Sequence, residues 1–157
     1  MFGVLDDNEK EACRTRLNDI LQFIDILSPD LYDHELTRSD DVSDPEQEMY
    51  RWGYVTTKNN MTVTIPIIFV SYNPSTGYTS IHWSFYSKMM SSHPYELEIN
   101  VSRNDVFTHI NFGEEFSDDN VAAMFAIFND NNDAGKILFT LTGGINTIFE
   151  KYKDALK

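Results

Sequence analysis

The strongest pattern of hydrophobic and polar positions lies in two neighbouring segments, 61–71 and 78–87, which are joined by a turn. β-Branched residues dominate the first segment, as in strands that pack on a pleated surface. The second segment alternates strictly, so one face is expected in the core and the other against solvent or a partner. The expected core face is Thr79, Ile81, Trp83 and Phe85, and the expected open face is Tyr78, Ser80, His82, Ser84 and Tyr86.

Three more segments, 49–57, 95–102 and 106–112, repeat the strand pattern and are separated by short turns. Consecutive strands with short connections favour antiparallel pairing, because parallel pairs need long crossovers. Pro66 has no N–H to donate, so it marks an edge position, a bulge or the end of pairing. The apolar segment 136–142 is too short to classify by its period, and we predict a sixth strand there, with a helical turn as the alternative.

Amphipathic helices are predicted at both ends of the chain. Apolar residues recur at steps of three and four over 8–27, and Pro29 disfavours helix at the residue before it. Ser117, followed by two aspartates, is typical of a helix N-terminus, and a final helix is expected after Gly143–Gly144. The pattern therefore predicts a two-layer α+β fold. Its antiparallel meander sheet of five to six strands is covered on one face by an N-terminal helix and two C-terminal helices.

The composition is that of one folded domain spanning residues 1–157, because 41% of the residues are hydrophobic and 13% are aromatic. The single cysteine, Cys13, excludes an intrachain disulfide and suits a reducing compartment, so we expect a cytoplasmic location. The N-terminus lacks the basic and apolar regions of a secretory signal. No apolar run of about 20 residues is available to cross a bilayer.

The formal net charge of −13 opposes binding to a nucleic-acid backbone or an anionic membrane, and it permits a partner with a basic surface. Much of this charge lies in a predicted acidic loop at about 28–48. A connection of this length is either a solvated loop or an acidic segment that meets a partner. Its carboxylates include Asp40, Asp41, Asp44 and Glu46.

Catalytic chemistry would have to come from histidines on the open face. If the strands of His82 and His109 are neighbours, the two imidazoles meet near Glu96 or Glu98, which would suit metal binding or general acid–base catalysis. The spacing matches no metal signature such as HExxH. Asp130 and Asn132 match the first and third positions of an EF-hand loop, but Leu141 replaces the bidentate glutamate, so we expect a turn and no metal.

Aromatic side chains on an open sheet face with an acidic border are more typical of a protein-binding surface than of a catalytic pocket. The alternative is that these aromatic residues belong to the core. The predicted binding residues are Tyr78, His82, Tyr86, Trp52, Tyr54, Asp40, Asp41, Asp44 and Glu46.

We therefore expect a non-enzymatic acidic protein-binding module without a cofactor: an inhibitor, immunity, adaptor or chaperone-like protein. A homodimer through the open sheet face is also compatible with the pattern. In composition the chain is similar to small acidic α+β proteins of secretion systems and bacteriophages, and no motif identifies a family. One alternative is a small hydrolase or metal-dependent enzyme. The other is a DNA mimic, which requires the carboxylates of 28–48 and 114–119 to lie side by side.

Overall fold

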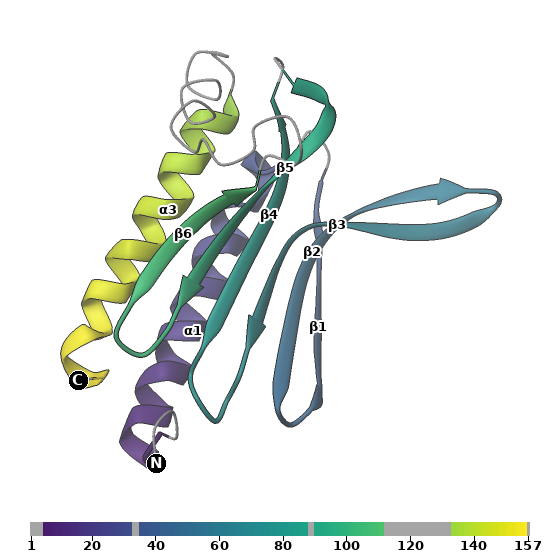
Figure 1. The fold of residues 1–157 in the computed structure, drawn as a ribbon. Helices are drawn as coiled ribbons and strands as arrows, with labels where there is room; N and C mark the ends of the chain where they lie inside the picture. Colours follow the sequence, from purple (N-terminus) through teal and green to yellow (C-terminus); the bar gives the residue numbers. More distant parts are fainter. Residues whose placement is uncertain (1–4, 33–34, 88–89, 112–132, 157) are drawn as a thin grey trace.

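The computed structural model describes residues 5–32, 35–87, 90–111 and 133–156, and within these ranges the side chains of 85–95, 111 and 133–135 are not described. Six strands form one antiparallel sheet beside two long helices (Figure 1), which confirms the predicted α+β class. The strands, in order across the sheet, are β1 (Thr37–Asp44), β2 (Gln47–Lys58), β3 (Met61–Tyr72), β4 (Thr79–Ser87), β5 (Met90–Val101) and β6 (Val106–Asn111). The helices are α1 (Asp7–Leu27) and α3 (Asp133–Tyr152), and short 3₁₀ turns follow them at η1 (Ser28–Asp30) and η3 (Lys153–Leu156).

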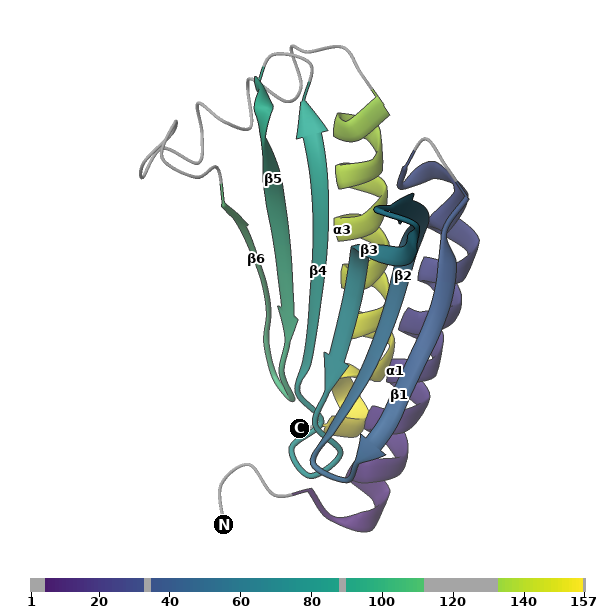
Figure 2. The same cartoon turned by 90° about the vertical axis from the view of Figure 1, so that its right-hand side faces the viewer.

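One face of the sheet is buried against α1 and α3 (Figure 2). Its centre is a row of register partners, Ile68, Trp83 and Leu97, each at most 1% exposed. Burial of a large apolar side chain contributes about 1.5–3 kcal/mol, so this layer is the main source of stability. The helices supply Leu17, Ile20, Ile24, Leu138, Leu141, Ile145 and Phe149 to the same cluster.

Helix α1 begins with a capping box, in which Asp6 accepts a hydrogen bond from the Glu9 N–H at 2.8 Å and Glu9 accepts one from the Asp6 N–H at 3.2 Å. Its apolar side is buried as the periodicity predicts. Arg16, which the sequence places with the polar residues, is also fully buried. Its guanidinium donates to the carbonyls of Gly77 at 3.0 Å and Ser102 at 3.1 Å, and thereby ties two turns of the sheet to α1.

The predicted strand at 136–142 is wrong, because these residues belong to α3, which continues through Gly143 and Gly144. The buried positions 138, 141, 145 and 149 are separated by three or four residues, so the helical period becomes clear only when the segment is not divided at the glycines. The sixth strand is instead β1, which lies within the segment 28–48 expected to be a loop. The helix predicted from Ser117 and the turn at Asp130 and Asn132 lie outside the described residues.

The two glycines of α3 have different surroundings, which gives a matched pair of substitutions. A Cβ at Gly144 would overlap the Phe23 ring of α1, whereas one at Gly143 would meet nothing within 4 Å. We expect Gly143→Ala to raise the free energy of unfolding by about 0.5–1 kcal/mol, since alanine favours helix. Gly144→Ala should lower it by about 1–3 kcal/mol, since the Phe23 ring must move. Urea denaturation measures both, and equal effects would contradict this account of helix contact.

Strands β2 and β3 extend beyond the sheet as a two-stranded ribbon, residues 54–65, which we call the arm (Figure 1). The β1–β2 pairing ends at Gly53, and the β3–β4 pairing begins at Ile68. Pro66 lies at a shift in the β2–β3 register, which confirms that it marks a bulge. It also lies just beyond Ile68, where the pairing of β3 with β4 ends. Asn59 and Asn60 turn the chain at the tip of the arm with positive φ angles of 53° and 64°.

Candidate functional site

The face of the sheet opposite the helices carries a connected set of polar and aromatic side chains, which we call the open face. These side chains alternate along each strand with the buried ones, as the pleat requires. The described members used below are Phe69, Ser71, Tyr78, Ser80, His82, Glu96, Glu98, Asn100, Phe107 and His109.

Asn100 is the centre of a hydrogen-bond network on the open face. Its Oδ1 accepts from the hydroxyls of Tyr78 at 2.8 Å and Ser80 at 3.1 Å, and its Nδ2 donates to Oε1 of Glu98 at 3.1 Å. Asn100 is only 3% exposed and Ser80 8%, although both lie on the face opposite the described helices α1 and α3. The network therefore holds the surrounding side chains in fixed positions, which lowers the entropy cost of binding to them.

The His82 ring is held from both sides. It stacks on Phe69 with centroids 4.4 Å apart and planes 5° from parallel, and its Nε2 lies 2.9 Å from the Ser80 hydroxyl. Nδ1 is 3.9 Å from a carboxylate oxygen of Glu96. This arrangement presents a rigid aromatic platform with a carboxylate at its border.

The residues of the enzyme alternative share this face. Glu98 on β5 is the register partner of both His82 on β4 and His109 on β6, so the two histidine strands are separated by β5 and are not direct neighbours. Within the described residues, no group of three or more His, Cys, Asp or Glu side chains is placed to hold a metal ion. The row formed by His82, Glu98 and His109 can place an imidazole beside a carboxylate, as proton transfer requires. It provides no metal centre in this part of the chain.

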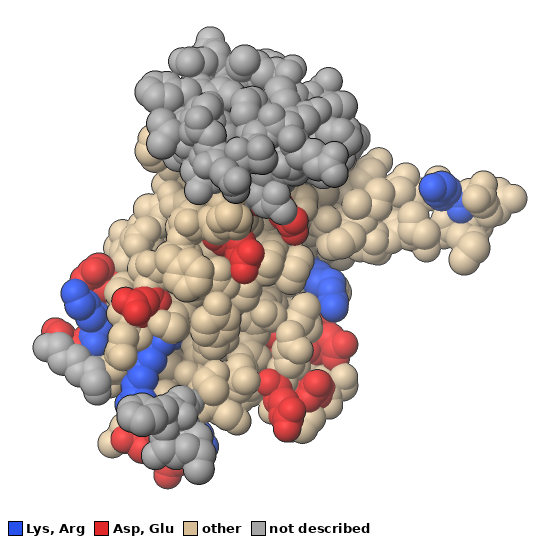
Figure 3. All heavy atoms as spheres, in the orientation of Figure 1, with Lys and Arg blue, Asp and Glu red and all other residues tan. Residues whose placement is uncertain are grey.

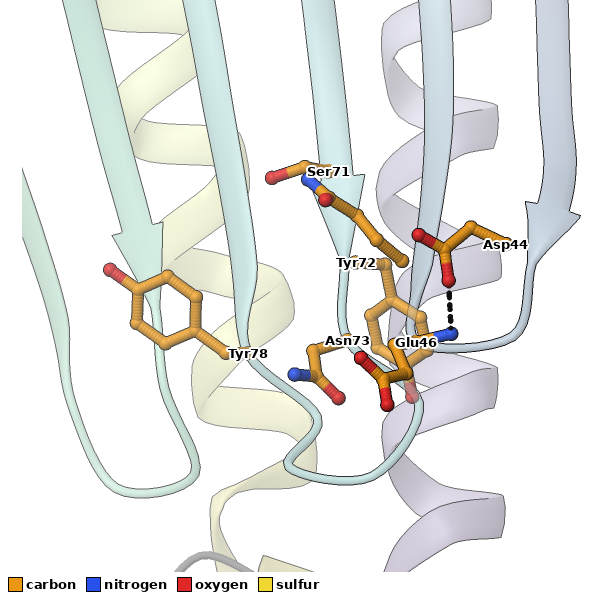
Figure 4. A pocket seen from close by; sticks show the side chains of 7 residues that line it. Asp44, Glu46, Ser71, Tyr72, Asn73 and Tyr78 are labelled. Carbon is orange, nitrogen blue, oxygen red and sulfur yellow. Dashed lines mark hydrogen bonds between the residues drawn. The ribbon is translucent and has the colours of Figure 1, made fainter.

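A pocket of about 340 Å³ opens at the end of the sheet where the β1–β2 and β3–β4 turns meet (Figure 4). Asp44 accepts a hydrogen bond from the Glu46 N–H at 2.8 Å, which fixes the acidic wall of the pocket. Tyr78 forms part of the opposite wall, and its hydroxyl reaches Asn100 of the open face. The ion pairs found among the described residues do not include Asp44 or Glu46. The complete lining is Asp44, Glu46, Gln47, Ser71, Tyr72, Asn73 and Tyr78.

The pocket brings together predicted binding residues from two distant segments: Asp44 and Glu46 at the β1–β2 turn, and Tyr78 just before β4. Burial is the main cause that raises the pKa of Tyr78, and the charge of Glu98 adds to it. The phenol therefore stays protonated over a wider range of pH and keeps its hydrogen bond to Asn100. Asp41 lies in β1 on the open-face side, fully exposed, and hydrogen bonds from Ser43 lower the pKa of its carboxyl.

Other predicted binding residues lie away from the open face, and the prediction is wrong for Trp52. Trp52 is 1% exposed on the covered face and donates its indole N–H to Asp25 at 2.9 Å, so the core interpretation holds for it. Asp40 is on the same covered-face side, where it pairs with Arg38 at 2.9 Å. The residues Tyr54 and Tyr32, with ring centroids 5.5 Å apart, are in contact at the base of the arm.

The remaining predicted residues lie outside the part of the chain that the structure describes in full. The side chains of Tyr86 and His93 are not described, and His34 and the acidic cluster 114–119 lie outside the described residues. The DNA-mimic alternative depends on that cluster.

Sequence reasoning missed Asn100 and Phe69 as parts of the site. The alternation of 95–102 does place Asn100 outward, and this is the only local signal for it. Its contacts depend on the β4–β5 register, which pairs it directly with Ser80.

Comparisons with protein-family models, with curated proteins and with solved structures found no match to this chain. In the described part of the chain, no helix is both long and apolar enough to cross a membrane. The function is therefore inferred from the open face and the pocket beside it.

Proposed function

We propose that this protein is a non-enzymatic acidic module of the cytoplasm that binds a basic segment of a protein partner. The observation that carries the proposal is the pocket, whose lining includes Asp44, Glu46 and Tyr78 and whose two carboxylates belong to no described ion pair. Carboxylates without a counter-charge at a surface attract cations and orient an approaching basic partner. An inhibitor, immunity, adaptor or chaperone-like role would use the same surface.

The geometry supports a two-part contact. A lysine or arginine of the partner enters the pocket, where the carboxylates of Asp44 and Glu46 accept its hydrogen bonds. Adjoining apolar residues of the partner then cover the stacked Phe69 and His82 rings. Because the Asn100 network already fixes Tyr78, little side-chain entropy is lost on binding.

A charge reversal in the pocket tests this proposal. Glu46→Lys keeps the Asp44 hydrogen bond to the backbone of the turn, so the turn itself should persist. Glu11→Lys changes the net charge equally at an exposed position of α1 and serves as the control. Proteins captured from the native host should be retained by wild type and Glu11→Lys and lost by Glu46→Lys. With a purified captured partner, calorimetry should show Kd raised at least about tenfold. Equal affinity of all three proteins would refute the proposal.

The second candidate is a small hydrolase, which is favoured by the row of His82, Glu98 and His109 with Glu96 at its border. General acid–base catalysis by such a pair would give turnover of activated ester or phosphate substrates, such as p-nitrophenyl compounds. If the protein is a hydrolase, wild type should turn over these substrates and His82→Ala should not. If it is a binding module, neither protein should show turnover.

A further inference from the structure

The arm differs in composition from the rest of the chain. Residues 54–65 contain no carboxylate and one charged side chain, Lys58, in a protein of net charge −13. Figure 3 shows the arm with a blue group near its end, projecting from a body with several red groups. The exposed fractions of Met61, Ile65 and Val55 are 66%, 47% and 45%. Large apolar side chains concentrated on a projecting element indicate a contact surface.

No strand in the described part of the chain pairs with the two outer edges of the arm. Pairing with β1 ends at Gly53, and pairing with β4 begins only at Ile68, so the arm strands pair with each other alone. A two-stranded ribbon is at best marginally stable in water without a further layer. Its free edges and apolar side chains would be stabilised by docking on another surface.

The register gives the arm an apolar stripe that ends in a cation. Ile65 pairs with Tyr54, Val63 with Thr56 and Met61 with Lys58, so these six side chains share one face. The opposite face is Val55, Thr57, Thr62 and Thr64. The stripe continues the side of β2 that carries Trp52, which is the helix side of the sheet, and at the base Tyr54 contacts Tyr32. It therefore points away from the open face of its own chain.

The open face has the complementary arrangement. It offers aromatic side chains, among them Phe69 and the 54% exposed Phe107, and at one end the pocket of Asp44 and Glu46. An apolar stripe with a terminal ammonium matches an aromatic surface with a terminal pair of carboxylates. Two chains of charge −13 repel each other, and the arm is a segment that brings no carboxylate to the contact.

We propose that the occupant of the open face is the arm of a second copy, with Lys58 of one chain in the pocket formed by Asp44 and Glu46 of the other. A reciprocal exchange of two arms closes the assembly with two-fold symmetry and covers the apolar stripe of both arms. This inference rests on the proposed function, because it names the basic segment that the pocket binds.

Sedimentation equilibrium on the full chain and three groups of variants tests the exchange. Wild type should dimerise, and Lys58→Glu and Glu46→Lys should each raise the dimer Kd by at least about tenfold, because each places like charges together. Lys10→Glu, an equal charge change at an exposed site on α1, should leave the Kd within about twofold. The double variant Lys58→Glu/Glu46→Lys restores the opposite charges and should recover most of the affinity.

Two results would overturn the arm exchange: a wild-type monomer at about 100 µM, or equal dimer Kd values for Lys58→Glu and Lys10→Glu. The proposed function fails separately. If Glu46→Lys loses a captured partner while wild type is monomeric, the pocket binds a foreign basic segment and only the second copy is refuted. If Glu46→Lys changes neither self-association nor partner capture, both proposals are refuted.

Discussion

Replacing Arg16 with alanine is expected to lower the free energy of unfolding by about 3–5 kcal/mol. Arg16 is 0% exposed, and its two terminal nitrogens donate to carbonyls of Gly77 and Ser102, one in each of two turns. Each charge-assisted hydrogen bond contributes about 1.5–3 kcal/mol, and the substitution also leaves a cavity beside the core. Urea denaturation followed by circular dichroism measures the loss.

Two variants control for the loss of a side chain at this position of α1. Arg16→Lys keeps the charge, but one ammonium cannot reproduce the planar fork that reaches both carbonyls, so it should recover less than half of the stability. Thr15→Ala, at the exposed neighbouring position, should change stability by no more than about 0.5–1 kcal/mol. An effect of Arg16→Ala as small as that of Thr15→Ala would show that Arg16 does not hold the turns.

The second large effect is expected at Glu48, where Glu48→Gln should lower the free energy of unfolding by about 2–4 kcal/mol at neutral pH. The 9% exposed Glu48 accepts from both terminal nitrogens of Arg14, at 2.6 and 2.7 Å, and from the Tyr50 hydroxyl at 2.5 Å. Glutamine cannot accept the bidentate pair. The Arg14 side chain is 42% exposed and remains hydrated in the variant, so the cost lies below that of a fully buried pair.

The same site predicts a pH dependence. The hydrogen bonds from Arg14 are the main cause that lowers the pKa of Glu48 below its usual value. The unfolded chain therefore binds more protons at this residue than the folded chain. The stabilisation is complete above the unfolded pKa of about 4.3 and is lost as the pH falls through the folded value.

Wild type should lose stability more steeply than Glu48→Gln as the pH falls below about 4.5. Glu11→Gln, at an exposed site on α1, should follow the wild-type profile. Parallel profiles for wild type and Glu48→Gln would contradict the assignment.

Local pattern predicted most of the strands and α1, because their apolar residues recur with the period of the element. It also assigned Ile81 and Trp83 to the core and His82 to the opposite side, since a pleated strand turns successive side chains to opposite faces. Strand β1 carried no such signal. Its sequence, TRSDDVSD, has one apolar residue, and it is a strand because the turn at Asp44 folds it along β2.

The candidate site depended on contacts between segments that are distant in the sequence. Asn100 joins Tyr78 and Ser80 because of the β4–β5 register, and the pocket exists because two turns meet at one end of the sheet. The β2–β3 register, by contrast, pairs Trp52 with the buried Ile68 and places it in the core, although its aromatic character suggests an exposed contact residue.

The amino-acid sequence by itself determined the class of fold, the acidic character and the outward direction of His82 and Glu98, since these follow from composition and from the two-residue period of a strand. Only the tertiary structure decided which outward side chains meet, that Arg16 is buried, and that residues 54–65 project from the sheet. Strand register, turn position and helix docking set these features, and each is fixed by packing between segments far apart in the chain.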